Sequence, residues 1–128
     1  MFMDSTASVM MERAISGTWQ RTQLINHNIA NQDTPHFKAM RIDFETHLRT
    51  AMDRGARSET TRQGRLNRIR EAQPRIYRDE RTEYRVDGNN VDADAEHIEL
   101  ARVQIQYQLL RDRLNGHFNT MRTAIVGQ

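Results

Sequence analysis

Two long stretches with helical periodicity stand near the two ends of the chain. In the first, from about residue 5 to residue 32, the recurring positions are Met11, Ile15, Thr18, Thr22, Ile25 and Ile29. In the second, from about residue 91 to residue 125, they are Leu100, Val103, Tyr107, Leu110, Leu114, His117, Met121 and Ala124. Alternating spacings of three and four place these side chains on one stripe of a helix. The pattern therefore predicts two long helices with heptad-like stripes, which we call the N-terminal seam and the C-terminal seam.

Pro35 marks the end of the first helical stretch. Proline has no backbone N–H to donate, and its ring disfavours helical geometry at the preceding residue, Thr34. The short polar side chains of Asp33 and Thr34 also favour turns, because they bond to nearby backbone groups. We therefore expect the helix to stop here and the chain to leave in an extended form through Phe37 and Lys38.

A shorter amphipathic helix is predicted within residues 41–52. Phe44, Leu48 and Met52 recur every four residues, which places them on one helical face. Gly55 is expected to end this helix, because glycine readily adopts the left-handed conformation found after helix ends.

Residues 49–85 are polar and basic, with eleven arginines against six acidic residues. We expect this middle segment to be largely irregular and mobile in the isolated chain, with residues 58–64 in a loop. The apolar and aromatic residues at 76–77 and 84–86 could form short extended pieces or a small β-hairpin.

A turn and a helix start follow the basic segment. Asp87, Gly88, Asn89 and Asn90 form a strong turn signal. The next helix is expected to begin after Val91, with Asp92 or Asp94 as its cap and Glu96 in its first turn. Gly127 stands beyond its expected end.

The predicted fold is mainly α, a coiled-coil-like hairpin of the two long helices within a single unit, residues 1–128. Its parts are the first helix (1–34), the turn, short helix and flexible middle (35–90), and the last helix (91–128). Only 37% of residues are hydrophobic, whereas soluble domains usually reach about 45–50% when glycine is counted. We therefore expect the outer faces of the helices to be covered by neighbouring molecules.

Candidate chemistry is weak. The chain has no cysteine, and none of its five histidines (27, 36, 47, 97 and 117) stands at a recognised metal-ligand spacing. The oxygen-rich run from Asp87 to Glu96 fails the calcium-loop register because Val91 occupies the fifth position. We expect no catalytic, cofactor or metal site. No secretory signal or membrane span is expected either.

The arginine-rich segment from Arg57 to Arg85 leaves one alternative open. Its arginines could contact nucleic-acid phosphates, and Tyr77 and Tyr84 could stack on bases. Acidic residues are interleaved throughout, however, and no nucleic-acid-binding module is recognisable. A solvated linker or a surface that faces an acidic protein is the favoured interpretation.

The stretch from residue 30 to residue 39 resembles the A-N-x-x-T-P-x-Y-K-A signature of bacterial flagellar rod and hook proteins. The matching residues are Ala30, Asn31, Thr34, Pro35, Phe37, Lys38 and Ala39. The second motif, residues 87–92 with Glu96, is similar to the corresponding region of proximal rod subunits. Two residues depart from the signature. His36 replaces the usual glycine, which predicts that this position needs no positive φ, and Phe37 lacks the usual tyrosine hydroxyl.

The resemblance implies a structural subunit of the flagellar basal-body rod, not an enzyme. Family members assemble as a hollow tube that transmits torque, with both terminal helices in its inner layer. The implied partners are FlgC-like, FlgF-like and FlgG-like rod subunits, a FliE-like base component and the export gate. The implied location is the periplasmic rod, reached by type III export without a cleaved signal peptide. Larger relatives carry an inserted outer domain, for which this chain has no room.

Overall fold

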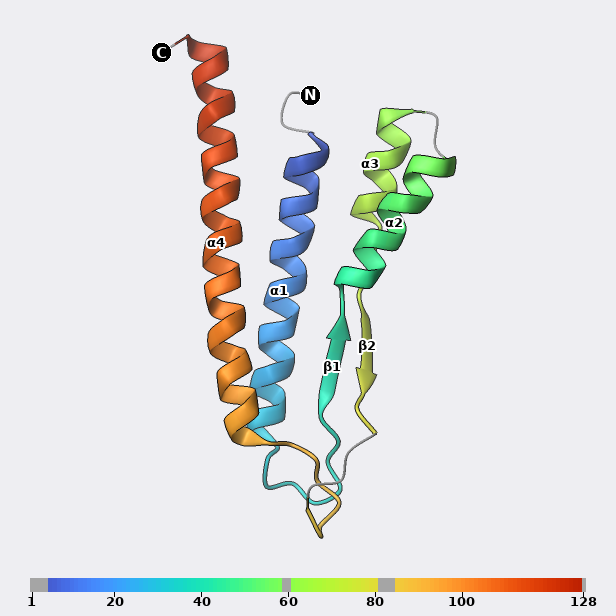
Figure 1. Cartoon of the computed structure of the whole chain (residues 1–128), viewed down its shortest axis with the longest axis vertical. Coiled ribbons are helices and arrows are strands. Elements are labelled where there is room, and N and C mark those ends of the chain that lie inside the picture. Colours follow the sequence, from blue (N-terminus) through green and yellow to red (C-terminus); the bar gives the residue numbers. More distant parts are fainter. Residues whose placement is uncertain (1–4, 59–60, 81–84, 128) are drawn as a thin grey trace.

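The computed structural model describes residues 5–58, 61–80 and 85–127. Its elements are α1 (Thr6–Ala30), β1 (Met40–Asp43), α2 (Glu45–Ser58), α3 (Arg62–Arg70), β2 (Arg75–Arg78) and α4 (Ala93–Val126). Figure 1 shows three elongated columns, with α1 between α4 on one side and the β-strands with α2 and α3 on the other. The prediction of a mainly α fold with two long terminal helices is confirmed.

The ends of the long helices follow from local side-chain chemistry. Ser5 caps α1, since its hydroxyl accepts a hydrogen bond from the backbone N–H of Ser8 at 3.0 Å. Asp92 caps α4 by accepting from the N–H of Ala95 at 3.1 Å. Gly127 closes α4 in the left-handed conformation at a φ of 74°. The expected start and end of the last helix are therefore confirmed.

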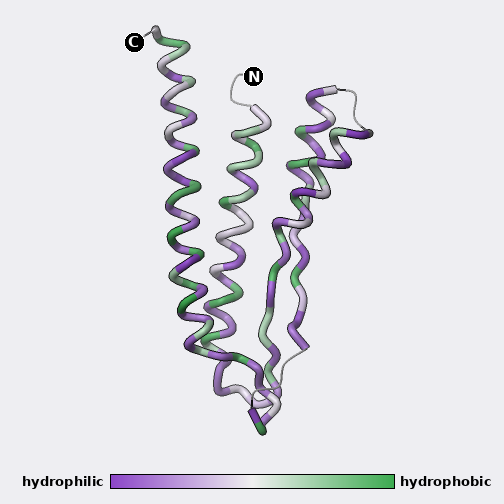
Figure 2. Tube along the Cα trace, in the orientation of Figure 1, coloured by the Kyte–Doolittle hydropathy of each residue, from purple (hydrophilic) through white to green (hydrophobic). Residues whose placement is uncertain are grey.

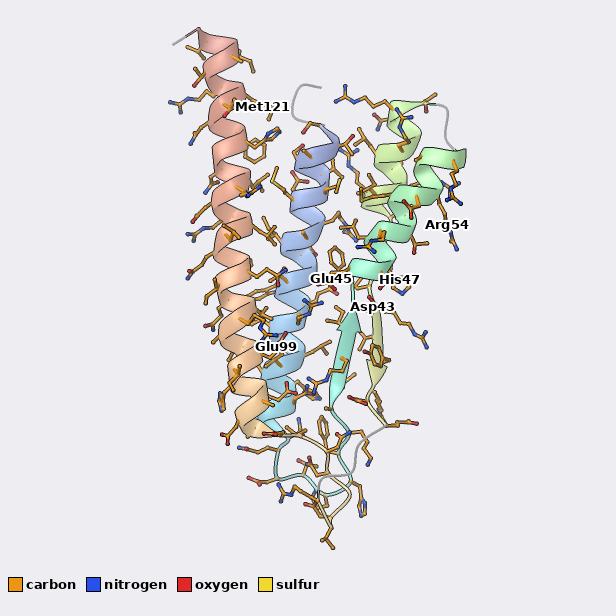
Figure 3. All side chains as sticks on the ribbon, viewed as in Figure 1. Asp43, Glu45, His47, Arg54, Glu99 and Met121 are labelled. Atoms are coloured by element: carbon orange, nitrogen blue, oxygen red, sulfur yellow. The ribbon has the colours of Figure 1, made fainter. Side chains whose placement is uncertain are left out.

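The two seams bring α1 and α4 together as an antiparallel pair (Figure 1). Ile25 and Val103 are buried, and the other seam positions are partly or fully covered except Ala124, which is exposed. The hydroxyl of Ser5 lies 3.0 Å from Nε2 of His117 near the start of α1. α4 continues past this point, and Met121 lies on the extension (Figure 3). The last turns of the C-terminal seam thus extend beyond the described part of α1.

A second face of α1 packs against the middle of the chain. Phe44 lies on Gly17, so that a Cβ built on this glycine would be 2.5 Å from the ring. Nearer the start of α1, Val9 forms a buried cluster with Leu66 and Ile69 of α3. Met10, Leu48 and Met52 pack around this cluster. α1 therefore forms the centre of the fold and has apolar contacts on two sides.

The prediction for residues 41–55 was wrong at both ends. Arg41, Ile42 and Asp43 belong to strand β1, and α2 begins only at Glu45. The spacing of Phe44, Leu48 and Met52 had suggested an earlier helix start. α2 also continues past Gly55 to Ser58. Gly55 lies against α3 instead, with its Cβ position 3.6 Å from the Cα of Arg65.

The expectation of an irregular basic middle was wrong for residues 62–70, whereas the extended piece predicted at residues 76–77 is confirmed as part of β2. Residues 62–70 form α3, which includes Gln63 and Gly64, while Thr61 is its N-cap. β2 pairs antiparallel with β1, in the register Met40 with Arg78 through Asp43 with Arg75. The hairpin partner predicted for this strand was residues 84–86, and its described part, residues 85 and 86, does not pair with β2. Tyr84 lies outside the described residues, as does Thr60 of the predicted loop.

Apolar residues are distributed along the helices in short groups separated by polar residues (Figure 2). No helix in the described ranges has a stretch long and apolar enough to cross a membrane.

Candidate functional site

Two segments that are far apart in the chain meet where α1 ends and α4 begins. Figure 1 shows the loop after α1 and the loop before α4 side by side at this end of the molecule. The first loop carries the signature of residues 30–39, and the second carries residues 87–92. We call the combined structure, residues 28–41 and 85–96, the motif junction.

Asn89 closes the end of α1. This residue is fully buried, and its side-chain amide donates to the carbonyl oxygens of Asn31, Gln32 and Thr34 at 3.0, 3.1 and 2.8 Å. A carbonyl oxygen can accept two hydrogen bonds, and Asn89 supplies one to each of these three carbonyls at the helix end and in the turn after it. Asn89 also accepts from the N–H of Val91 at 2.7 Å, which orients the amide. One side chain of the second motif therefore satisfies three carbonyls of the first.

Arg85 reinforces the same connection from the surface. Its guanidinium donates to the carbonyl oxygen of Gln32 at 2.9 Å and lies 3.6 Å from Asp33 and 3.2 Å from Asp87. A positive charge at a helix C-terminus is favourable because the carbonyl end of the helix dipole is negative. Because these side chains are partly exposed, the contribution to stability is small.

Asn90 connects the exit from α1 to the end of β2. Its side-chain oxygen accepts from the N–H of Ala39 at 2.7 Å, and its amide donates to the carbonyl of Asp79. Its backbone N–H donates to the carbonyl of Phe37 at 3.3 Å. Asn90 is buried, as is Ala39. The two adjacent asparagines therefore bind three different segments.

His36 contradicts the expectation that this position needs no positive φ. Its φ is 60°, and Gly88, which approaches it, has a φ of 77°. A Cβ on Gly88 would lie 2.9 Å from Nδ1 of His36. The backbone N–H of His36 donates to the carbonyl of Asp87 at 3.0 Å, which holds the turn in place. The left-handed backbone at position 36 thus explains why the signature usually has glycine there. This chain adopts the same conformation with a histidine.

The aromatic residue of the signature packs back on α1. Phe37 is half-buried and meets His27 edge to face, with ring centroids 5.5 Å apart. Thr34 donates through its hydroxyl to the side chain of Asn31 at 3.2 Å. Pro35 is exposed in the turn. The signature residues therefore shape and anchor the chain reversal.

Asn28 adds a contact that the sequence analysis did not single out. It is fully buried, and its side-chain amide pairs with the backbone of Met40 as a neighbouring strand would. Met40 N–H donates to Oδ1 at 2.8 Å, and Nδ2 donates to the carbonyl at 3.0 Å. Nδ2 also donates to the carboxylate of Glu96 at 3.2 Å. Asn28 therefore joins α1, β1 and α4.

Glu96 is a buried carboxylate, with only 1% of the residue exposed. Arg41 of β1 lies 2.5 Å from its Oε1 and offsets the charge. Asp79 lies 4.0 Å from the same guanidinium. Burial of an unpaired carboxylate would be costly, so Arg41 is required once Glu96 is inside the fold.

Asn28 and Arg41 were missed because their partners are distant in the sequence. The one local signal was the position of Asn28 on the flank of α1, roughly 100° around the helix from the seam and one helical turn after Leu24. Nothing in the local sequence distinguished Arg41 from the other arginines. Glu96 was predicted only as part of the helix start.

A cleft of about 490 Å³ lies beside this network, between α1, the strands and the start of α4. Arg21 and Glu99 line it, together with Arg41, Tyr77 and Glu96. Above the strands, Arg21 donates to Glu45 at 2.6 Å, and this bond holds the pKa of Glu45 below its ordinary value. The same bond raises the pKa of Arg21. Figure 3 labels Glu45 at the start of α2 and Glu99 on α4.

The polar and ionisable side chains of this site, among the described residues, make structural contacts. Among them, no group of three or more histidine and acidic side chains could hold a metal ion. His27 packs on Phe37, and His117 meets Ser5. The acidic residues of the second motif are used in turns, in the cap and in the buried pair.

In the described residues, the arginine-rich segment contributes the end of α2 and forms α3 and β2. Tyr77 is half-buried against the cleft, whereas Tyr84 lies outside the described residues. Nothing in the fold supports the nucleic-acid alternative.

Comparison with known proteins decides what kind of protein carries this junction. The chain is 36% identical over 117 residues to the flagellar basal body rod protein FlgB of Bacillus subtilis, covering 91% of each chain. The chain belongs to the FlgB family. It is also 35% identical over 109 residues to the FlgB protein of Cereibacter sphaeroides, covering 84% of each chain. The FlgB protein of Escherichia coli is 30% identical over 122 residues, covering 89% of this chain and 88% of its own. No model of a known protein family matches the chain.

Membership of the FlgB family makes the chain a structural protein of the flagellar basal-body rod, as the resemblance implied. The relatives match nearly the whole chain, so the motif junction and most of the two terminal helices fall within FlgB-like sequence. None of these FlgB relatives supports a nucleic-acid-binding function.

Proposed function

We propose that the chain is a proximal rod subunit that assembles with its own copies and with other rod subunits into a hollow, torque-transmitting tube. The family assignment supports the rod, and the similarity of residues 87–96 to proximal rod subunits supports the proximal position. The chain acts through packing contacts, without catalysis and without a cofactor.

The observation that carries this proposal is an apolar stripe on the outer face of α4. Ile98, Ile105 and Leu109 are 65%, 68% and 59% exposed. Their spacings of seven and four place them on one face, roughly opposite the buried seam residue Val103. Exposed apolar residues that align along a helix are typical of a surface that another molecule covers. We call this surface the outer stripe.

The sequence-predicted residues receive structural roles in this proposal. The seams hold α1 and α4 together, and the signature sets where α1 ends and the chain turns outward. The second motif, with Asn89 and Asn90 at its centre, locks that turn to α4. The whole of residues 1–128 then works as one axial unit.

The proposed partners are FlgC-like, FlgF-like and FlgG-like rod subunits, a FliE-like base component and the export gate. The proposed location is the periplasmic rod, after type III export without cleavage of a signal peptide. The resemblance to rod proteins supports both statements. An intact mass of the chain recovered from basal bodies tests the second, because cleavage would shorten it.

A double substitution in the outer stripe, Ile105→Asp with Leu109→Asp, tests assembly directly. Both side chains are exposed, so the purified variant should keep its helical circular dichroism spectrum. Charges on a packed subunit interface are unfavourable, so incorporation into the rod should be lost. The measurement is the amount of chain in basal bodies purified from a strain that carries only the variant, with Ile105→Leu as the matched control. Normal incorporation of the double variant would remove the support for this proposal.

A further inference from the structure

A groove of about 300 Å³ lies between α1 and α4. The described residues that line it are Trp19, Thr22, Gln104, Tyr107, Gln108 and Arg111. All of them belong to the two long helices, which run side by side (Figure 1). We call this surface the Trp19 groove.

Trp19 is exposed in this groove, although folding usually covers most of a tryptophan side chain. It is 56% exposed, and it is the only tryptophan of the chain. Tyr107 and Arg111 of α4 line the same groove. Tryptophan, tyrosine and arginine are the residue types that most often contribute strongly to binding at protein interfaces. The composition of the groove therefore indicates a surface that another protein covers.

The two helices are nearly free of charge at this level. Residues 103–110 include no Asp, Glu, Lys or Arg, and residues 14–32 include only Arg21, although 28% of the whole chain is charged. Arg21 lies roughly 200° around α1 from Trp19 and is paired with Glu45. Depletion of charge is typical of the buried centre of a protein interface.

The outer stripe lies at the same level of α4, on the neighbouring face. Ile105 follows Gln104, and Leu109 follows Gln108, while consecutive residues are about 100° apart around a helix. The stripe and the groove therefore occupy the same turns of α4 without sharing a residue. One molecule carries both an aliphatic ridge and an aromatic groove.

We propose that the Trp19 groove receives the outer stripe of a second copy of the chain. The inference rests on the proposed assembly into a rod, and it adds which surface covers the outer stripe. A groove between two helices accepts the apolar ridge of a third helix, and spacings of seven and four in the stripe suit such packing. The aliphatic side chains of the stripe then cover Trp19, so both exposed apolar surfaces leave water in one contact.

The presence of both halves of the contact on one chain selects a second copy as the occupant. The two halves cannot meet within one molecule, because the stripe faces away from α1 and the groove lies beside α1. A contact between two different patches is heterologous, so it repeats from copy to copy and builds rings or helical arrays. Because both patches lie at one level, copies with parallel long axes meet side by side without a shift along that axis.

Introduced cysteines test the contact, because the chain has none of its own. One variant carries Gln104→Cys in the groove, a second carries Ile98→Cys in the stripe, and a third carries both. Positions 98 and 104 are about 9 Å apart along α4, too far for a disulfide within one molecule. A second set replaces Gln104→Cys with Gln108→Cys, which moves the groove cysteine by about one turn.

Each variant is expressed as the full chain in a strain that lacks the native gene. Basal bodies are purified and mildly oxidised, and the chain is separated on a non-reducing gel. We expect the double variant of at least one set to form a ladder of covalent multimers, while each single variant stays monomeric. Coexpression of the two single variants should give dimers only, because each copy then has one cysteine.

Trp19→Ala tests the groove without a crosslink. Incorporation into basal bodies should fall about tenfold or more, because the groove loses its largest side chain. The matched control is Ile76→Ala, an exposed apolar residue of β2 that belongs to neither surface, and it should incorporate normally. Circular dichroism of each purified variant separates loss of contact from loss of fold.

Monomers alone in both double variants would overturn the proposed contact while leaving the rod function intact. Dimers of a single-cysteine variant would also overturn it, because like surfaces would then meet. A covalent product with a different rod protein would show that the occupant is not a second copy. Incorporation of Trp19→Ala at the native level would contradict the groove as the receiving surface. Absence of the unmodified chain from basal bodies would instead contradict the proposed function.

Discussion

The ring of Phe44 occupies the space that a side chain on Gly17 would need. A Cβ at Gly17 would lie 2.5 Å from two ring atoms, closer than real Cβ atoms come. Phe44 is itself buried, so its ring has little room to move. Glycine in a helix interior is otherwise unfavourable by about 1 kcal/mol relative to alanine. This contact therefore explains why α1 contains a glycine at its centre.

We expect Gly17→Ala to destabilise the chain, although alanine is the better helix former. Overpacking of a filled site typically costs about 1–3 kcal/mol, which exceeds the gain in helix propensity. The matched control is Gly116→Ala in α4, where nothing lies within 4 Å of the new methyl group. That variant should gain about 0.5–1 kcal/mol. Thermal unfolding followed by circular dichroism measures both, and equal shifts of the same sign would contradict the Phe44 contact.

Asn89 gives a second prediction, because it satisfies three carbonyls at the end of α1. Asn89→Ala should cost about 1–3 kcal/mol, since a fully buried side chain and the three hydrogen bonds that it donates are lost. Asn89→Asp should cost more, because a carboxylate would face the same carbonyls and the negative end of the helix dipole. Urea unfolding of the purified variants measures the difference.

The control for Asn89 is Asn26→Ala, an exposed asparagine on α1 whose side chain makes no hydrogen bond to a described residue of the junction. Its stability should change by less than about 0.5 kcal/mol. If Asn89→Asp proved as stable as the unmodified chain, the amide would not be the donor that closes α1.

The buried pair of Arg41 and Glu96 predicts a non-additive result. Arg41→Ala should lower the free energy of unfolding by about 2–3 kcal/mol, because it leaves a buried carboxylate without its partner. This loss is smaller than for a fully buried pair, since 36% of the Arg41 side chain is exposed. Adding Glu96→Gln to Arg41→Ala should recover part of this loss, because the amide keeps a polar partner for Asn28 without the charge. A double-mutant cycle in urea measures the coupling, and additive losses would show that the two side chains act independently.

The long helices could be predicted because their signals are local. Seam spacing, the Asp92 cap and Gly127 each act within one or two helical turns, and Asp92 and Gly127 have their predicted roles. Pairing of α1 with α4 followed from the two seams alone.

The middle of the chain could not be predicted, because its structure depends on distant partners. β1 exists because residues 40–43 pair with residues 75–78, and a spacing of four in Phe44, Leu48 and Met52 extended the predicted helix into it. α3 has only Leu66 and Ile69 to indicate a buried side, and both need Val9 to be buried. Gly55 signalled a helix end, but serves as the point where Arg65 crosses α2.

The site was predicted as two separate motifs, and their combination came only from the fold. The sequence indicated the turn propensity of Asn89 and Asn90. Nothing local, however, shows that an asparagine will donate to backbone carbonyls about 55 residues earlier in the chain. At His36 the residue type gave the wrong prediction, because a non-glycine residue adopts a left-handed backbone there.

The ion pair of Arg21 and Glu45 predicts a pH dependence of stability. The hydrogen bond from Arg21 lowers the pKa of Glu45 below its ordinary 4.5 in the folded chain. Its contribution is therefore fully present above pH 4.5 and is lost as the pH falls through the lower folded pKa. With 60% of the Glu45 side chain exposed, the effect should stay below about 1 kcal/mol. Thermal unfolding measured across this pH range should show a smaller acid destabilisation in Glu45→Gln than in the unmodified chain; an identical pH profile for the two would contradict the role of this pair.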